Sequence, residues 1–108
     1  MALPRKPQSR LQAKADLEQH ALQIADENIE AAIKFVDAVE ATIVQLCQHP
    51  ESGGQFVTSD HKLLDIRAKP VNGFGRFVLF YRDNGDTLEV VRLLAGGDDM
   101  DALIHRKN

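Results

Sequence analysis

One stretch of the sequence, residues 66–103, constrains the fold most strongly. It contains a short strand pattern, a tight hairpin with Asn84 and Gly85 at its turn, and a glycine-rich exit into a final helical pattern. Two helical patterns precede it, and helices segregated from strands along the chain are typical of an α+β domain. We therefore predict a two-helix hairpin packed on a small, mainly antiparallel sheet, in the order β-α-α-β-β-β with a short C-terminal helix.

Two consecutive helices are predicted, over residues 11–27 and 29–48. Apolar residues recur at helical spacing in the second and form one stripe: Ala32, Phe35, Val36, Val39, Ile43 and Leu46. Asn28 is suited to cap the start of the second helix, and His49-Pro50 ends it. A connection this short forces the two helices into an antiparallel hairpin.

Three strands are predicted after the helices, over residues 63–71, 74–82 and 87–94. Alternation in the first sends Leu64 and Ile66 to one face. The second is apolar on both faces, with Phe77, Leu79 and Tyr81 on one and Val78 and Phe80 on the other. A strand of this kind is usually central in its sheet. Asn84-Gly85 predicts a type I′ turn between the last two strands.

The two ends of the chain carry weaker signals. Residues 1–12 are expected to form an extended basic arm or an edge strand, because Pro4 and Pro7 lack the N–H group that a sheet interior requires. Residues 13–108 are expected to form a single domain. Near the C-terminus, Asp98 or Asp99 is suited to cap a helix over residues 100–105.

The charge distribution bears on the class of partner. The net charge is −3, and residues 15–60 carry nine acids but only one base, Lys34. Proteins that bind nucleic acid through a broad surface are basic there, so direct nucleic-acid binding is not favoured. No apolar run approaches the roughly 20 residues of a membrane helix, so no membrane association is expected. The single cysteine, Cys47, excludes an internal disulfide and fits a cytoplasmic location.

No cofactor or metal site is expected. The phosphate-binding, dinucleotide-binding and metalloprotease motifs are absent. The four histidines do not occur at the spacing of metal ligands: His20, His49, His61 and His105. Three acids after the glycine pair suit a helix start better than a cation site: Asp98, Asp99 and Asp101.

Four arginines lie within or beside the predicted strands: Arg67, Arg76, Arg82 and Arg92. Grouped on one sheet face they would bind phosphate or a carboxylate-rich partner. They would alternatively pair inside the molecule with Asp65, Glu89 and the acidic helices, and we favour this structural reading. Tyr81 suits a core position better than a role as a general acid or base.

Four segments, in this order, resemble the RelE/ParE toxin superfamily on its ParE side. They are AKADLEQHALQIADEN (13–28), IEAAIKFVDAVEATIVQLCQHPESG (29–53), IRAKPVNGFGRFVLFYR (66–82) and LEVVRLLAGGDDMDALI (88–104). The resemblance implies the toxin of a bacterial type II toxin–antitoxin system, connected with plasmid stabilisation and neutralised by a cognate antitoxin. ParE proteins inhibit DNA gyrase, whereas RelE proteins cleave mRNA on the ribosome.

The resemblance also bears on whether the chain acts by binding or by RNA cleavage, because three positions depart from the family pattern. Ala95 stands where the family usually has histidine, Asp98 where arginine is common, and Val78 where RNA-cleaving members often have arginine. A nuclease would have to rely on Arg67, Arg76, Arg82 and Tyr81. RNA cleavage requires groups that activate the 2′-hydroxyl and stabilise the phosphorane. We therefore predict a binding inhibitor rather than a nuclease, with a RelE-like endonuclease or an inactive antitoxin-binding member as alternatives.

The antitoxin is expected in the groove between the helical hairpin and the sheet. The residues predicted to bind it combine apolar stripe positions with strand arginines: Phe35, Val39, Arg67, Arg76, Arg82 and Arg92. The expected assemblies are a homodimer or a toxin–antitoxin heterotetramer.

Overall fold

The computed structural model describes residues 3–56 and 63–96. The elements are β1 (Lys6–Ser9), α1 (Leu11–Glu27), α2 (Ile29–Gln48), a 3₁₀ turn η1 (Pro50–Ser52), β2 (Gly54–Gln55), β3 (Arg67–Val71), β4 (Phe74–Asp83) and β5 (Thr87–Ala95). The predicted α+β class and the two predicted helices are confirmed. The expected helix over residues 100–105, with its capping candidates Asp98 and Asp99, lies outside the described residues.

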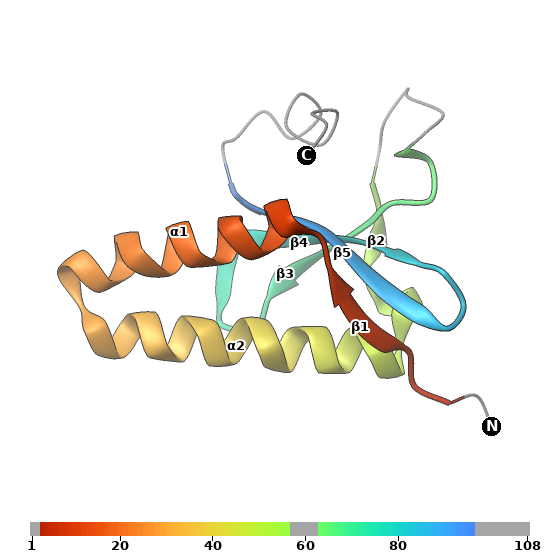
Figure 1. Ribbon diagram of the computed structural model, residues 1–108, viewed down its shortest axis with the longest axis horizontal. Helices are drawn as coiled ribbons and strands as arrows, with labels where there is room; N and C mark the ends of the chain where they lie inside the picture. The colour runs from red at the N-terminus through yellow and green to blue at the C-terminus, as the bar shows by residue number, and fades with distance from the viewer. Residues whose placement is uncertain (1–2, 57–62, 97–108) are drawn as a thin grey trace.

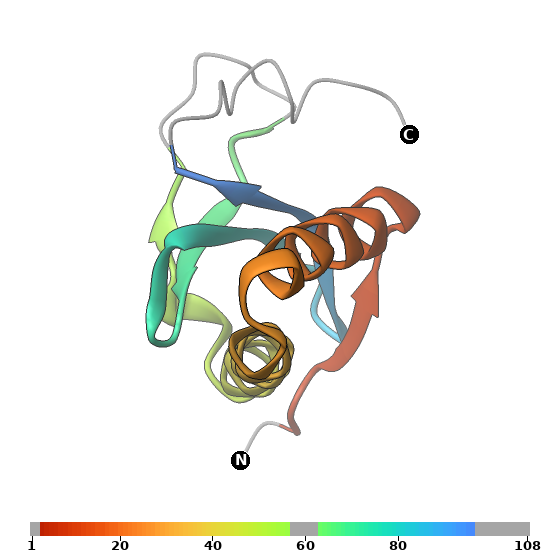
Figure 2. The same cartoon turned by 90° about the vertical axis from the view of Figure 1, so that its left-hand side faces the viewer.

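The strands form one mixed sheet in the order β1-β5-β4-β3-β2. β1 runs parallel to β5, and every other neighbouring pair is antiparallel. β4 is therefore the central strand, as its two apolar faces predict. The two helices lie side by side on one face of this sheet (Figures 1 and 2).

The helical hairpin turns at Asn28. The Asn28 side chain accepts a hydrogen bond from the Ala31 N–H at 3.0 Å, which satisfies one of the free donors at the start of α2. Asn28 also ends α1, because its own N–H donates to the Ile24 carbonyl at 2.9 Å. One residue thus ends one helix and starts the next, which makes the connection as short as the sequence predicted.

Two apolar clusters cover the two faces of the sheet. The cluster between sheet and helices contains these buried residues: Ala13, Phe35, Val39, Leu46, Cys47, Val71, Phe77, Leu79, Tyr81, Leu88, Val90 and Leu93. The cluster on the opposite face contains Leu63, Ile66, Phe80, Val91 and Leu94. The predicted assignment of β4 side chains to the two faces is confirmed.

The predicted strand over residues 63–71 begins later than expected. β3 starts at Arg67, because residues 63–66 form a turn in which the Ile66 N–H donates to the Leu63 carbonyl at 3.1 Å. This turn buries Leu63 (8% exposed) and Ile66 (0%) and leaves Leu64 at 49%. The prediction that Leu64 and Ile66 share a face was therefore wrong, since alternation does not apply in a turn.

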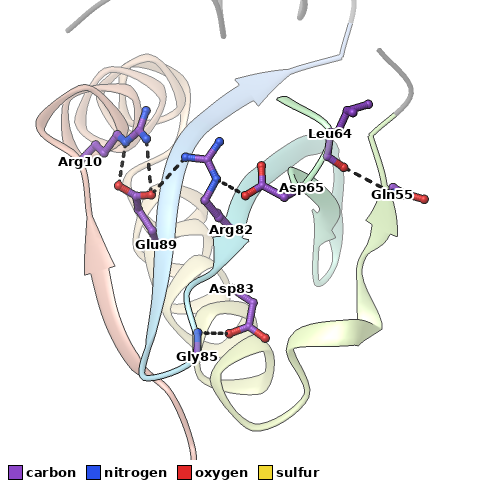
Figure 3. Close-up of polar contacts among 8 residues, drawn as sticks. All are labelled: Arg10, Gln55, Leu64, Asp65, Arg82, Asp83, Gly85 and Glu89. Atoms are coloured by element: carbon purple, nitrogen blue, oxygen red, sulfur yellow. Dashed lines mark hydrogen bonds and ion pairs between the residues drawn. The ribbon is translucent and has the colours of Figure 1, made fainter. Parts of the chain in front are cut away.

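The β4–β5 turn also differs from its prediction. Gly85 has a positive φ of 90°, but Asn84 does not, so the turn is not of type I′. Three residues, 84–86, lie between the strands, and such a loop needs only one residue with positive φ. The Gly85 N–H also donates to Asp83 Oδ1 at 3.0 Å (Figure 3). This side-chain contact stabilises the turn, and the prediction from Asn84-Gly85 did not take it into account.

The N-terminal segment contributes the edge strand β1. The N–H groups of Lys6 and Arg10 donate to the carbonyls of Asp86 and Val90 at the β5 side. Because alternate residues of a strand point their backbone groups to opposite sides, Pro7 has its nitrogen on the open side, where no donor is required. No helix in the described ranges is long and apolar enough to cross a membrane.

Candidate functional site

Tyr81 lies in the core and is not available to a substrate. Its side chain is 0% exposed. Its Oη donates a hydrogen bond to the Pro50 carbonyl at 2.6 Å and accepts one from the Gly53 N–H at 2.9 Å. Burial raises the pKa of the Tyr81 phenol. Gly53 must lack a side chain here, because a Cβ would collide with the Tyr81 ring. Tyr81 therefore fastens the segment after α2 to the central strand.

Arg67 holds the same segment from the neighbouring strand. Arg67 and Tyr81 are cross-strand partners in the register of β3 and β4. The Arg67 Nη1 group donates to the Gly53 carbonyl at 2.8 Å. Tyr81 thus binds the N–H group of Gly53 and Arg67 binds its carbonyl, so both side chains have a structural role.

Arg82 lies between two carboxylates (Figure 3). Its Nε is 2.7 Å from Asp65 Oδ2, and its Nη1 is 3.7 Å from Glu89 Oε1. Glu89 also accepts from Arg10 Nε at 2.9 Å. The result is a row of alternating charges, Arg10–Glu89–Arg82–Asp65, that extends from the residue between β1 and α1 to the turn before β3. The internal pairing that the sequence favoured is confirmed for this arginine.

Arg92 is buried against the first helix. Its Nε donates to Asp16 Oδ2 at 2.7 Å and its Nη2 to Asp16 Oδ1 at 3.0 Å. The Leu93 N–H donates to the same carboxylate at 3.0 Å. Both side chains are more than nine-tenths buried. The pair therefore joins α1 to β5, and a partner cannot reach most of either charge.

Phe35 and Val39, the predicted apolar anchors for an antitoxin, are core residues. Their side chains are 0% and 1% exposed, between α2 and the sheet. An amphipathic stripe buries its members against the domain's own sheet first. The expectation that these two residues line an open groove was wrong, because the space between hairpin and sheet is filled at their level.

An open groove lies nearer the α1–α2 turn. It is bounded by α1 and the first residues of α2, by the start of β4 and by the end of β5. It has a volume of about 610 Å³. Its lining comes from both helices and both strands: Asp16, Gln19, His20, Gln23, Ile24, Glu27, Asn28, Ala31, Arg76, Phe77, Arg92, Leu94 and Ala95. We name it the hairpin groove. Arg76 and Arg92 are the two predicted binding residues that it brings together.

Arg76 is the predicted site residue that stays exposed. Its guanidinium carbon lies 5.3 Å from the centroid of the Phe77 ring. Within residues 3–56 and 63–96, no carboxylate pairs with it. No group of three or more potential metal ligands occurs in these residues either.

Comparison with known proteins decides the family. The model described as "ParE toxin of type II toxin-antitoxin system, parDE" matches residues 10–100. The chain belongs to the ParE toxin family. The resemblance predicted from the four sequence segments is thereby confirmed. No curated protein sequence gives a match.

Solved structures support the ParE-type fold. The chromosomal ParDE toxin–antitoxin system from P. aeruginosa contains a chain that aligns with a TM-score of 0.70 and 17% identity, over 85% of this chain and 96% of that one. The RelBE2 toxin–antitoxin complex from Mycobacterium tuberculosis contains one that aligns with a TM-score of 0.53 and 19% identity, over 86% and 99%. At such identities the likeness concerns the fold alone.

This ParE-family chain has a second unpartnered surface, which the sequence pattern did not indicate. The outer side of the α1–α2 hairpin exposes Leu22 at 60%, Ile29 at 69% and Ile33 at 58%. A shallow depression of about 410 Å³ lies there and is lined by Glu18, Ala21, Leu22, Ala25, Ile29, Ala32, Ile33, Val36 and Asp37. We name it the outer hairpin surface. Helical periodicity predicted the buried apolar stripe of the second helix. It did not indicate that these exposed residues form another apolar surface.

Proposed function

We propose that this ParE-family chain is a toxin that binds and inhibits a target such as DNA gyrase, and that a cognate antitoxin neutralises it. One observation carries the choice of binding over RNA cleavage. Arg76 and Arg82 lie six residues apart on β4, and six residues of a strand span about 20 Å. Two guanidinium groups anchored so far apart do not converge on one scissile phosphate.

The remaining nuclease candidates support the same choice. Tyr81 is buried, and its hydroxyl is used by Pro50 and Gly53. Arg67 donates to the Gly53 carbonyl. RNA cleavage requires a group that removes the 2′-hydroxyl proton and cations that stabilise the phosphorane, all within reach of one nucleotide. These three arginines and the tyrosine do not supply such a constellation.

The proposal of a protein antitoxin draws on the exposed apolar residues. Contiguous apolar patches on a small protein usually mark interaction sites. The outer hairpin surface and the hairpin groove meet at the turn around Asn28, since Asn28 and Ala31 line one and Ile29 and Ala32 line the other. A single antitoxin segment that passes over this turn would cover both surfaces. A cytoplasmic location and a toxin–antitoxin heterotetramer or toxin homodimer belong to the same proposal.

The first experiment is to induce the chain in a bacterial host alone and together with the product of the adjacent gene. The proposal expects growth arrest in the first case, and normal growth with a co-purifying complex in the second. Transcripts incubated with ribosomes and the purified chain should remain intact. Cleaved transcripts would establish an endonuclease instead, and normal growth without the second gene would establish an inactive family member.

A further inference from the structure

We propose that Arg76 is the residue with which the hairpin groove recognises a carboxylate of the bound partner segment. This inference rests on the proposed function, because it assigns the partner's chemistry at that site.

Arg76 lies against a cluster of aromatic rings. Its guanidinium lies over Phe77, and the Phe77 ring is in edge contact with His20, with centroids 5.0 Å apart. The His20 ring is fixed in turn, because its Nε2 lies 2.9 Å from the Leu93 carbonyl oxygen, which can only accept. Phe77 also packs on Phe35 at 4.7 Å. A guanidinium above a ring face is attracted by the π-electrons and still has N–H donors available for a planar acceptor.

Among the described residues, Arg76 is the lining arginine without a carboxylate partner. The other lining arginine, Arg92, is paired with Asp16 in the interior. Arg76 has no carboxylate partner in the part of the chain that the structure describes. A carboxylate accepts two parallel hydrogen bonds from a guanidinium, which is the strongest match for its geometry.

The rest of the lining suits a peptide. Gln19, Gln23 and Asn28 place amide groups along the groove, and amides both donate to and accept from a peptide backbone. A nucleic acid is disfavoured, because it would bring a row of phosphates against Glu27 and the acidic hairpin, whereas a peptide segment can bring one carboxylate to Arg76 and otherwise neutral groups. The expected ligand is therefore an aspartate, a glutamate or a terminal carboxylate on a protein segment.

The test measures the affinity of the purified chain for the product of the adjacent gene by calorimetry. The variants are Arg76→Glu, Arg76→Lys and a matched charge reversal, Lys6→Glu. Lys6 is exposed on β1 and pairs with Thr87 at the start of β5, whereas the groove is lined by the other end of that strand. Losing one member of a desolvated charge pair weakens binding by about 30-fold or more, so Arg76→Glu should reach that level. The affinity of Arg76→Lys should lie between those of Arg76→Glu and the parent chain, because lysine keeps the charge but lacks the planar guanidinium group. Lys6→Glu should bind like the parent chain.

Each acidic side chain of the partner's bound segment is then changed to lysine in turn. One such change should restore most of the affinity for Arg76→Glu while weakening binding to the parent chain. Equal affinity of the parent chain and Arg76→Glu would overturn the inference and leave the antitoxin proposal intact. An absence of binding by the parent chain itself would overturn both, as would competition for the groove by a short RNA in place of the protein.

Discussion

Asp16 on α1 binds Arg92 on β5 through two hydrogen bonds of 2.7 and 3.0 Å, with both side chains buried. The same carboxylate accepts from the Leu93 N–H at 3.0 Å. Three donors on one strand therefore converge on one helical side chain. This contact fixes how α1 lies on the sheet, and it forms the inner wall of the hairpin groove.

The Asp16–Arg92 pair leads to a stability prediction. Arg92→Ala leaves a buried carboxylate without its counter-charge, so the free energy of unfolding should fall by about 3–5 kcal/mol. The double change Asp16→Leu with Arg92→Met removes both charges and should cost less than Arg92→Ala alone. Urea unfolding followed by circular dichroism measures both. Equal losses for the single and double variants would show that the charge pairing is not what matters.

Tyr81→Phe should destabilise the chain without changing partner binding. The substitution removes the hydroxyl that bonds Pro50 and Gly53 and leaves two buried backbone groups unpaired, at a cost of about 1–3 kcal/mol. Growth arrest by correctly folded protein should persist. Loss of toxicity at an unchanged level of folded protein would instead give Tyr81 a direct part in activity.

The Tyr81 phenol offers a direct spectroscopic readout, since the chain has one tyrosine and no tryptophan. Burial raises its pKa in the folded state. The stability that this shift reflects is complete below the ordinary tyrosine pKa of about 10 and is lost as the pH rises through the folded value. Near-ultraviolet titration should therefore show phenolate only above that ordinary pKa, together with unfolding. Ionisation at the ordinary value with the fold intact would contradict the buried position.

The β1 strand should loosen in acid. Arg5 Nε donates to Asp83 Oδ1 at 2.9 Å, and this hydrogen bond lowers the pKa of the Asp83 carboxyl. The corresponding stability is present above the ordinary aspartate pKa of about 4 and is lost as the pH falls through the lower folded value. Asp83→Asn should flatten this acid limb of the stability profile. Asp37→Asn, an exposed change on α2, should leave the limb as steep as in the parent chain.

The helices and the central strand could be predicted because local periodicity encodes them. The α2 stripe and the two faces of β4 repeat at their own characteristic spacing, and Asn28 is a cap by its chemistry alone. β2 was missed because two residues, Gly54 and Gln55, carry no periodic pattern. The β3 boundary was misplaced because Leu63 and Ile66 are buried by a turn that mimics the start of a strand.

The site was less predictable, because its geometry depends on distant contacts. Asp16 and Arg92 are 76 residues apart, and nothing in either helix or strand pattern pairs them. Periodicity placed Phe35 on an apolar stripe but did not show whether the sheet or a partner covers it. The partners of Arg82 were easier to predict, since Asp65 lies just before β3 and Glu89 lies in β5, the two neighbours of β4.

The outer hairpin surface should carry much of the antitoxin affinity. Ile33→Asp places a charge on this surface. It should weaken the complex by about tenfold or more, because the complex loses the free energy of burying one apolar side chain. Val44→Asp is a matched control, because Val44 lies on the same helix with a similar exposure of 55% but outside that surface. Equal effects of both changes in a pull-down titration would argue against this placement of the antitoxin.

A supercoiling assay with purified DNA gyrase and the purified chain measures directly whether this chain inhibits the enzyme. The purified chain should block supercoiling, and stoichiometric antitoxin should restore it. Arg82→Gln, which removes a nuclease candidate paired with Asp65 and Glu89, should still inhibit when folded. Unimpaired supercoiling, accompanied by ribosome-dependent transcript cleavage that Arg76→Ala abolishes, would show that the chain is a nuclease and not a gyrase inhibitor.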